Sequence, residues 1–239
     1  MNTLKIKTNP KARLFFVTDI HGELPTLLKA LEDLNFSETV DTLVCCGDLI
    51  DRGRYSKETA EWFMEKHHDI ESNIYTVLGN HDVFAFENNH ATNCDNWVMN
   101  GGMWAFQDMS EPERRSFGLD MKTLPYAIEI SHGDKKIGVV HAGVGESYES
   151  WQDFLGKLED NNPYCKQGAV WDRDFVQYKE YEEYQKPLEG IDLLVHGHTP
   201  VKEPLQVGNR LHIDTGLVYG KHLTIYEFDE SQFHNFDLV

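Results

Sequence analysis

Short apolar runs alternate with amphipathic stretches over the first third of the chain. Three short, mainly apolar runs are typical of buried strands: residues 13–18, 42–46 and 73–78. Between them, residues 23–35 carry leucines at helical spacing, and residues 56–67 predict a second helix with Ser56 as its N-cap. This alternation of strands and helices predicts βαβ units in a parallel sheet.

The second half of the chain is richer in predicted strands. Residues 83–118 are aromatic-rich and predict helices, whereas residues 126–131 and 136–140 flank a His-Gly-Asp turn and predict a hairpin. Residues 191–195 form another apolar run, and residues 210–213 and 222–227 are expected to be late antiparallel strands. The acidic, tyrosine-rich stretch 147–190 is expected to be helical and irregular. No linker or repeat interrupts the pattern, so we expect residues 1–239 to form a single domain.

The charge of the chain excludes several classes of partner. Its 239 residues include 22 Lys and Arg against 40 Asp and Glu, which gives a formal net charge of −18. Nucleic acids and anionic membrane surfaces select basic proteins, so we expect neither as a partner. The apolar runs are only a few residues long and predict no membrane span, and the N-terminus lacks the apolar segment of a signal peptide.

The four cysteines indicate a reducing compartment. Cys45 and Cys46 are adjacent within an apolar run, while Cys94 and Cys165 form no Cys-x-x-Cys spacing. Buried, reduced thiols explain this pattern better than a disulfide framework does. We therefore expect a cytoplasmic protein.

Five polar clusters directly follow apolar runs. They are Asp19-Ile20-His21-Gly22, Gly47-Asp48-Leu49-Ile50-Asp51-Arg52-Gly53, Gly79-Asn80-His81-Asp82, His141-Ala142-Gly143 and His196-Gly197-His198-Thr199. Each cluster alone is more often an ordinary turn, but all five lie where strands are expected to end. The carboxyl ends of the strands in an open α/β sheet border one crevice, so we expect the clusters to converge on one site.

The side chains of these clusters point to metal chemistry. Asp19 and His21 are two residues apart and can face the same side on leaving a strand, and Gly47 permits close backbone approach beside Asp48. A carboxylate can bridge two divalent ions, which together lower the pKa of a shared water and hold a phosphoryl oxygen. Donors without cysteine favour Mn, Fe or Zn here over a structural zinc site. Arg52 offers a planar fork for phosphate oxygens.

These clusters resemble the signature of a known family. The segments TDIHG, GDLIDRG, VLGNHD, HAG and HGHTP are similar to those of the phosphoprotein phosphatase family of metallophosphoesterases. The segments NWVMNGGMWAF, LPYAIEI, VWDRD, GHTPVKEPL and HIDTGLVYG resemble bacterial and phage-lambda-type Ser/Thr protein phosphatases. The resemblance spans about residues 13–227. It implies the calcineurin-like metallophosphoesterase fold, an α/β fold with a central β-sandwich flanked by helices.

The resemblance also implies a set of metal ligands. Asp19 and His21 match ligands of a first metal, and Asp48 matches the carboxylate that bridges the two metals. Three residues match ligands of the second metal: Asn80, His141 and His198. The implied cofactor is a pair of divalent ions, Mn²⁺ first, with Fe or Zn as alternatives.

The remaining matches concern phosphate binding and proton transfer. Arg52 and Arg173 match phosphate-binding arginines, and Asn80 also contributes to holding the phosphate. His81 matches the general acid and Asp51 its orienting partner. The implied enzyme is a phosphomonoesterase acting on phosphoproteins, without a phospho-enzyme intermediate. In the implied mechanism, a metal-bridging hydroxide would attack phosphorus while His81 would protonate the departing Ser, Thr or Tyr oxygen.

One position departs from the family pattern and keeps an alternative open. Many members carry an arginine directly before the Gly-Asn-His segment, where this chain has Leu78. Symmetrical diadenosine tetraphosphate hydrolases share LGNHD, so Leu78 and Asp82 favour that activity as the alternative to protein phosphatase. A nucleic-acid phosphodiesterase is disfavoured by the net charge of −18. A non-catalytic metal-binding protein is disfavoured because it would not need Asp51 and His81.

Several neighbouring residues receive structural interpretations. Trp97, Trp104 and Phe106 predict a packed cap over the site rather than a base-stacking platform, because no basic residues interleave them. Asp82 is interpreted as a helix cap or as a carboxylate behind the ligands. His196 is interpreted as a neighbour of the matched ligand that faces the site.

Overall fold

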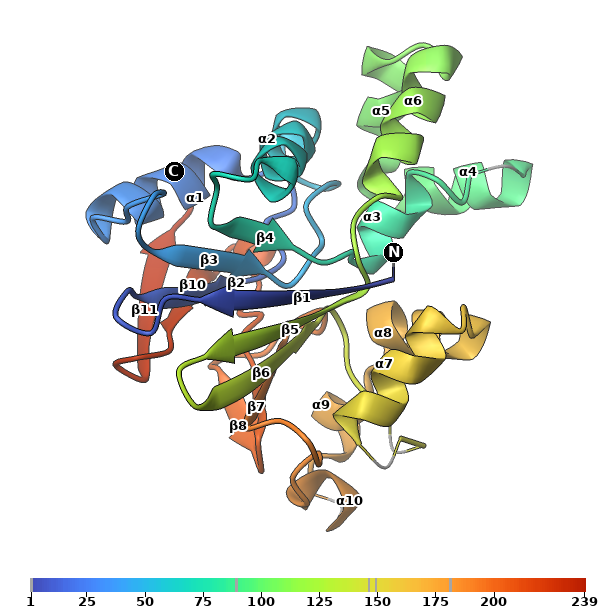
Figure 1. The fold of residues 1–239 in the computed structure, drawn as a ribbon. Helices are drawn as coiled ribbons and strands as arrows, with labels where there is room; N and C mark the ends of the chain where they lie inside the picture. The colour runs from blue at the N-terminus through green and yellow to red at the C-terminus, as the bar shows by residue number, and fades with distance from the viewer. Residues whose placement is uncertain (1, 89, 146, 149, 181) are drawn as a thin grey trace.

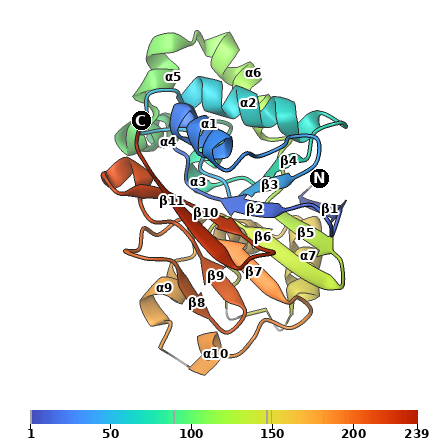
Figure 2. The same ribbon diagram turned by 90° about the vertical axis from the view of Figure 1, so that its left-hand side faces the viewer.

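Two β-sheets stack against each other, with helices outside them (Figures 1 and 2). The computed structural model describes residues 2–88, 90–145, 147–148, 150–180 and 182–239. Within these residues, one sheet has five strands in the order β11 (Gln232–Asp237), β10 (His222–Glu227), β2 (Leu14–Val17), β3 (Thr42–Cys45) and β4 (Ile74–Thr76). The other has six in the order β1 (Thr3–Thr8), β5 (Ala127–His132), β6 (Lys135–Val140), β7 (Leu193–His196), β9 (Arg210–His212) and β8 (Leu205–Val207).

The helices form three groups around the sheets. Two cover the five-stranded sheet, α1 (Leu24–Asp33) and α2 (Ser56–His68), and two lie beside the six-stranded sheet, α7 (Trp151–Glu159) and α8 (Pro163–Trp171) (Figure 1). After α3 (Asn80–Phe84), the chain forms what we call the helical cap: α4 (Ala91–Trp97), the π-helical turn η1 (Val98–Gly102), α5 (Met103–Asp108) and α6 (Glu111–Met121). Shorter elements are α9 (Asp174–Tyr178), α10 (Glu182–Gln185) and the 3₁₀ turn η2 (Leu217–Tyr219).

The short apolar runs form strands, and β2 and β3 are buried on both faces. In β2, Leu14 and Phe16 belong to the core between the two sheets, which also contains Ile128 of β5. Phe15 and Val17, on the opposite face of the same strand, belong to the core shared with α1 and α2. Every position of β2 is therefore apolar, because neither face of the strand meets water. This layered arrangement confirms the predicted α/β sandwich flanked by helices.

The predicted parallel pairing and the hairpin are confirmed, and three further strands lie at sheet edges. Of the two expected antiparallel strands, β10 pairs antiparallel with β2 and β11, whereas β9 pairs antiparallel with β8 but in parallel with β7. β2, β3 and β4 pair in parallel, and β5 and β6 form the antiparallel hairpin. The additional strands β1, β8 and β11 each occupy an edge of a sheet. In β1, Lys5 and Lys7 alternate with Leu4 and Ile6, so the strand has no continuous apolar run. Polar side chains also separate the apolar ones in β11, and β8 is only three residues long, so none of these edge strands has an apolar run that the sequence could reveal.

Ser56 is the first residue of α2, so its prediction as the N-cap was wrong. The N-cap is Tyr55, which makes no side-chain capping bond. The Ser56 hydroxyl instead accepts a hydrogen bond from the backbone N–H of Asp51 (2.9 Å) and donates one to the carbonyl of Gly53 (3.3 Å). It therefore stabilises the loop between β3 and α2.

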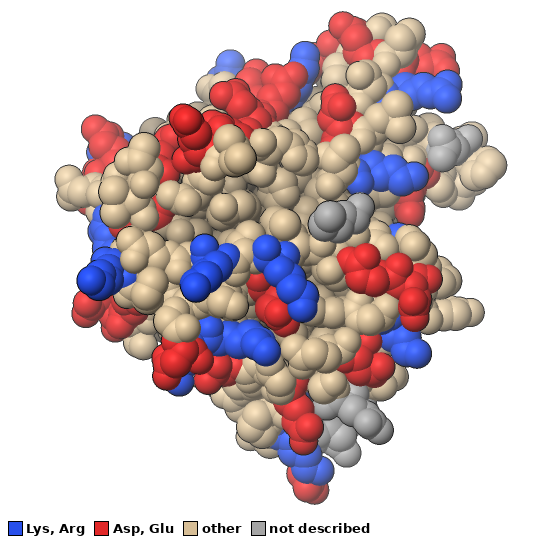
Figure 3. Space-filling model, in the orientation of Figure 1, with Lys and Arg blue, Asp and Glu red and all other residues tan. Residues whose placement is uncertain are grey.

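Charged side chains are unevenly distributed over the surface. Basic side chains gather over β1 and the β5–β6 hairpin, whereas acidic side chains are prominent over α1 and α2 (Figure 3). Part of the basic band is paired: Lys5 lies 3.1 Å from Glu129, and Lys135 lies 3.4 Å from Asp192. No helix in the described part of the chain has the length and hydropathy needed to cross a membrane.

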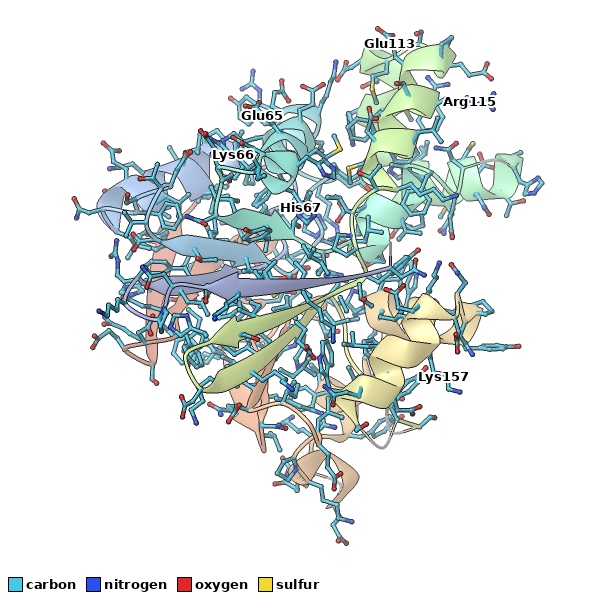
Figure 4. All side chains as sticks on the ribbon, viewed as in Figure 1. Glu65, Lys66, His67, Glu113, Arg115 and Lys157 are labelled. Atoms are coloured by element: carbon cyan, nitrogen blue, oxygen red, sulfur yellow. The ribbon has the colours of Figure 1, made fainter. Side chains whose placement is uncertain are left out.

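His67 connects the last turn of α2 to β4 (Figure 4). Its Nδ1 accepts a hydrogen bond from the backbone N–H of Thr76 (3.1 Å), which requires that this nitrogen carry no proton. Burial, with a smaller contribution from His68, lowers the pKa of His67 to about 4. The folded protein therefore holds this imidazole neutral.

We predict that His67 makes the fold sensitive to acid. Because its folded-state pKa lies below the ordinary 6.5, the unfolded chain binds the proton first, and stability falls as the pH drops from about 6.5 toward 4. His67 alone should remove about 2 kcal/mol of unfolding free energy between pH 7 and pH 5. Urea unfolding of the wild type and His67→Gln at both pH values measures this. An equal loss in the two proteins would contradict the prediction.

Candidate dinuclear metal centre

Five loops that follow strands meet at one end of the sandwich. Those after β2, β3 and β4 come from the five-stranded sheet, and those after β6 and β7 come from the six-stranded sheet. Within each sheet, backbone hydrogen bonds join neighbouring loops, from Asp19 N to Gly47 O (3.0 Å) and from Gly197 N to His141 O (2.7 Å). The backbone N–H of His198 donates to the Asp19 carboxylate (3.0 Å) and links the two sheets. The structure thus brings the five polar clusters together.

Left-handed backbone conformations are concentrated in these loops. Nine non-glycine residues in the described ranges have a clearly positive φ, and six of them lie here: Asp19, His21, Asp48, Asp51, Arg52 and His198. Such conformations cost of order 1–3 kcal/mol each and persist only where the surrounding structure enforces them. Four of the six match metal ligands of the family. The backbone strain therefore occurs at residues whose side chains have to point toward the donor groups.

Asp19, His21 and Asp48 form the first group of donors. The Nδ1 of His21 lies 2.8 Å from the carbonyl of Ile50, so Nδ1 donates and the lone pair on Nε2 faces the carboxylates. This Nε2 lies 3.9 Å from Asp19 Oδ1 and 3.5 Å from Asp48 Oδ2. Burial lowers the pKa of His21 to about 3, which keeps the imidazole neutral and able to bind a metal.

His141 is at the centre of the second group. Its Nδ1 lies 2.8 Å from the carbonyl of Cys46, which leaves Nε2 to face the other donors. Nε2 lies 3.1 Å from Asn80 Oδ1, 3.1 Å from His198 Nδ1 and 3.4 Å from Asp48 Oδ1. Burial lowers the pKa of His141, but nearby carboxylates, Asp48 first, outweigh burial and raise it to about 9. The negative field at this nitrogen therefore favours a cation, either a proton or a metal ion.

The donor chemistry fits two divalent cations. Asp48 lies between the two groups, with Oδ2 toward His21 and Oδ1 toward His141. One ligand atom each of Asp48, His141 and His198 lies within 4.8 Å of the other two. In each group, several lone pairs face one another with too few protons to join them all, an arrangement that bound cations stabilise. The donor atoms are oxygen and nitrogen, which accommodate several first-row metals.

His81 and Asp51 form a buried pair beside the first group. His81 Nδ1 lies 2.7 Å from Asp51 Oδ2, and the two side chains are 1% and 0% exposed. The backbone N–H of His81 donates a hydrogen bond to Asp48 Oδ1 (3.0 Å), which fixes the first turn of α3 against the Asp48 carboxylate. A ring nitrogen of His81 lies within 4.8 Å of donor atoms of His21 and Asp48. With Nδ1 engaged by Asp51, Nε2 is the nitrogen available to a substrate.

Each of the two matched arginines approaches one donor group. The Arg52 guanidinium contacts Nε2 of His21 and lies 5.3 Å from the ring centre of Tyr219. Arg173, between α8 and α9, donates a hydrogen bond to Thr199 Oγ1 (3.2 Å), directly after the donor His198. Burial, followed by the charges of neighbours that include Arg173, lowers the pKa of His198 to about 2. Both guanidinium groups therefore lie beside the histidines of the donor groups.

Asp82 joins two of the five loops. Its Oδ2 accepts hydrogen bonds from the backbone N–H groups of Gly79 (2.8 Å) and Asp48 (2.9 Å), and its Oδ1 accepts one from Leu49 (2.9 Å). Burial and the neighbouring Asp48 charge raise the pKa of Asp82 to about 7. Both interpretations of Asp82 therefore apply, because it caps α3 and also holds the backbone behind the donor Asp48.

Trp97 and Trp104 do more than pack over the site. The indole N–H of Trp97 lies 3.0 Å from both carboxylate oxygens of Asp51, and that of Trp104 donates to Oδ1 (2.8 Å). Phe106 packs against Trp97 with ring centres 5.4 Å apart. Buried indole N–H groups normally find a hydrogen-bond partner, which was the only sequence signal for these contacts.

His196 lies outside both donor groups. Its Nδ1 lies 2.8 Å from the carbonyl of Ala142, and its ring packs against Phe175 with centres 4.9 Å apart. Burial lowers the pKa of His196 well below its usual value, so the ring stays neutral. The interpretation that this histidine faces the site is therefore wrong. Its ring belongs to the packing between β7 and α9.

The chain belongs to the calcineurin-like phosphoesterase family. The family matches residues 12–202, a range that includes all five polar clusters. This membership confirms the resemblance found in the sequence and makes the protein a metallophosphoesterase, a hydrolase of phosphoesters. Two groups of histidine and aspartate side chains could each hold a metal ion: His21, Asp48 and His81 form one, and Asp48, His141 and His198 form the other.

Relatives with two different substrate names are similar to this chain over most of its length. Serine/threonine-protein phosphatase 2 of Salmonella typhimurium is 29% identical over 223 residues, covering 90% of this chain and 92% of the relative. The asymmetrical bis(5'-nucleosyl)-tetraphosphatase PrpE of Bacillus velezensis is 27% identical, covering 90% and 89%. A protein serine/threonine phosphatase structure from Saccharomyces cerevisiae superposes with a TM-score of 0.68 at 14% identity, covering 100% of this chain and 84% of that one. That last likeness concerns the fold alone.

We predict that Asp82→Asn weakens metal binding while the protein remains folded. The amide keeps the shape of the carboxylate but turns an NH₂ group toward backbone N–H groups, which loosens the loop carrying Asp48. Changes behind metal ligands typically cost about 10- to 100-fold in affinity, and we expect a loss in that range. Calorimetric titration of chelator-treated protein with Mn²⁺ measures it. Asp33→Asn, an exposed acid on α1, is the matched control, and equal affinities of the two variants would refute the role of Asp82.

Proposed function

We propose that the chain is a metal-dependent protein phosphatase that removes phosphate from phosphoserine and phosphothreonine. The observation that carries the proposal is the buried His81–Asp51 pair beside the donor groups. Serine and threonine alkoxides leave poorly, so hydrolysis of their phosphate esters depends on a positioned proton donor. The 29% identity to the Salmonella phosphatase over 90% of this chain supports the same substrate class. Phosphotyrosine is open to the same chemistry.

The donor groups would hold two divalent ions. When bound, such a pair lowers the pKa of a water molecule and polarises the phosphoryl oxygens. Asp19, His21 and Asp48 would hold the first ion, and Asp48 would share the second with three further residues: Asn80, His141 and His198. We expect Mn²⁺, with Fe or Zn as alternatives, because all of these donors are oxygen or nitrogen.

Arg52, Arg173 and Asn80 would orient the phosphoryl group. Phosphoryl transfer is catalysed mainly by positioning and by stabilising charge on the equatorial oxygens. Each guanidinium presents a planar fork of N–H groups that matches phosphate oxygens. Asn80 has its Oδ1 toward His141, so its NH₂ group remains for a phosphate oxygen.

His81 would protonate the departing oxygen. Asp51 accepts the hydrogen bond from Nδ1, which fixes the ring orientation and stabilises the protonated imidazole. The second proton is then on Nε2, the ring nitrogen that Asp51 does not engage. A positioned acid of this kind contributes about 10²- to 10⁴-fold to the rate. The reaction needs no covalent enzyme intermediate.

Cleavage of a dinucleoside polyphosphate is the second candidate function. Leu78 favours it, because its side chain is 1% exposed within the apolar core and offers no charge to a phosphate. The Bacillus relatives of this chain are named as asymmetrical tetraphosphatases. The His81–Asp51 pair, which we call the acid pair, favours hydrolysis of a phosphate monoester over cleavage of a dinucleoside polyphosphate. A phosphate leaving group needs less protonation than an alkoxide does.

The proposal includes the setting of the protein. Phosphoproteins are the proposed partners, and the net charge of −18 disfavours nucleic acid. All four cysteines are free thiols, which is consistent with a reducing, cytoplasmic environment.

Phosphate release from two substrates tests the proposal. Chelator-treated protein is reloaded with Mn²⁺ and given a phosphoserine peptide and diadenosine tetraphosphate in parallel. We predict faster turnover of the peptide, because His81 can protonate its leaving group, and loss of turnover when metal is withheld. Faster cleavage of the dinucleotide would favour the second candidate. Turnover that persists without metal would contradict both.

We predict that His81→Asn lowers kcat for the phosphoserine peptide by about 10²- to 10⁴-fold. The substitution removes the proton donor but leaves the six metal-binding side chains in place, so metal content measured by mass spectrometry should not change. His90→Asn, which alters an exposed histidine before α4, is the control and should keep full turnover. A His81 variant that loses its metal as well would show a ligand role instead of an acid role.

A further inference from the structure

The helical cap reaches the acid pair through a single carboxylate. Asp51 Oδ1 accepts from the indole of Trp104 (2.8 Å), Oδ2 lies 2.7 Å from His81 Nδ1, and the indole of Trp97 is shared between both oxygens at 3.0 Å. The two indoles come from the end of α4 and from α5, which project away from the sheets after α3 (Figure 1). Asp51 and Trp97 have no exposed surface. The buried carboxylate of Asp51 thus accepts hydrogen bonds from three side chains, and only one of these is His81, the proposed proton donor.

Two glycines allow the cap to approach this closely. Gly101 has φ +107°, and a Cβ added there would lie 2.8 Å from the backbone nitrogen of Arg52. A Cβ added at Gly102 would overlap the indole ring of Trp97. Any larger residue at either position would push the cap away from the loop after β3 or displace the indole. The Asn-Gly-Gly segment between the two tryptophans therefore allows both indoles to reach Asp51.

We propose that Trp97 and Trp104 are positioning residues that hold Asp51 in the orientation needed to align His81 for proton donation. This inference rests on the proposed role of His81 as the acid. A carboxylate bonded to one imidazole alone could rotate its plane, and the imidazole would rotate with it. Two further N–H donors in different directions fix that plane, and hydrogen bonds to an ionised carboxylate also stabilise its charged form.

The proposal gives the cap a role distinct from packing. The two indoles meet edge to face with ring centres 6.2 Å apart, and Trp104 also contacts Phe117 of α6 at 5.8 Å. The position of Asp51 is thus coupled to helices that lie outside the donor groups. The same segment contacts the backbone of Arg52 through Gly101, so the cap supports the acid pair and the adjacent arginine together.

Trp104→Phe tests the inference, because it keeps an aromatic ring and removes one N–H donor. The substrates are phenyl phosphate, whose leaving group needs a proton, and p-nitrophenyl phosphate, whose leaving group departs readily without one. We expect kcat for phenyl phosphate to fall roughly 5- to 20-fold with KM nearly unchanged, and kcat for p-nitrophenyl phosphate to change less than about twofold. Trp97→Phe should give the same pattern. Trp62→Phe, which alters a half-buried tryptophan packed on Phe63 of α2, is the control and should change neither substrate.

A double-mutant cycle separates positioning from structural support. If the tryptophan acts through His81, Trp104→Phe should have no further effect on phenyl phosphate in a His81→Asn background. An equal loss on both aryl phosphates, or an undiminished loss in that background, would overturn the inference. Full activity of His81→Asn on phenyl phosphate would overturn the acid role and the inference with it. Because the readout uses aryl phosphates, inactivity on phosphopeptides would refute only the protein substrate.

Discussion

The buried carboxylate of Asp48 is the group on which the rest of the site depends. It is 1% exposed, lies between two histidines and accepts the backbone N–H of His81. A buried charge is costly unless other charges and hydrogen bonds compensate it. Burial raises the pKa of Asp48, but neighbouring imidazoles, His141 first, outweigh burial and lower it well below the usual value. Its ionised form, with both oxygens shared, makes a cation on either side favourable.

The two apolar cores stabilise the fold enough to keep the buried charge of Asp48 and the strained loops around it in place. Strands buried on both faces hold the loop ends rigidly, and hydrogen bonds between loops enforce the left-handed conformations of Asp19, Asp48 and His198. Because the donors come from both sheets, any shift of one sheet against the other would separate them. The apolar packing between the sheets is therefore what gives the donor groups their geometry.

The chemical core and the surrounding helices have separate tasks. Relatives named for two different substrates are 29% and 27% identical to this chain. The helical cap is inserted between β4 and β5, and its two indoles donate hydrogen bonds to Asp51, the partner of His81. Under the proposed roles of His81 and Asp51, differences in leaving-group chemistry would arise in the cap while the loops that carry the donor groups stay the same.

The sequence by itself determined the central strands, the hairpin and the five clusters, because these depend on local features. Continuous apolar runs specify strands buried on both faces, and polar residues at their ends must lie at the sheet edge. The roles of Asp82, Trp97 and Trp104 were decided only by the tertiary structure. Asp82 bonds to backbone groups 33 and 34 residues away, and the indoles reach Asp51 across 46 and 53 residues. Hydrogen bonds between residues so far apart leave no periodic pattern in the chain, so only the folded packing reveals them.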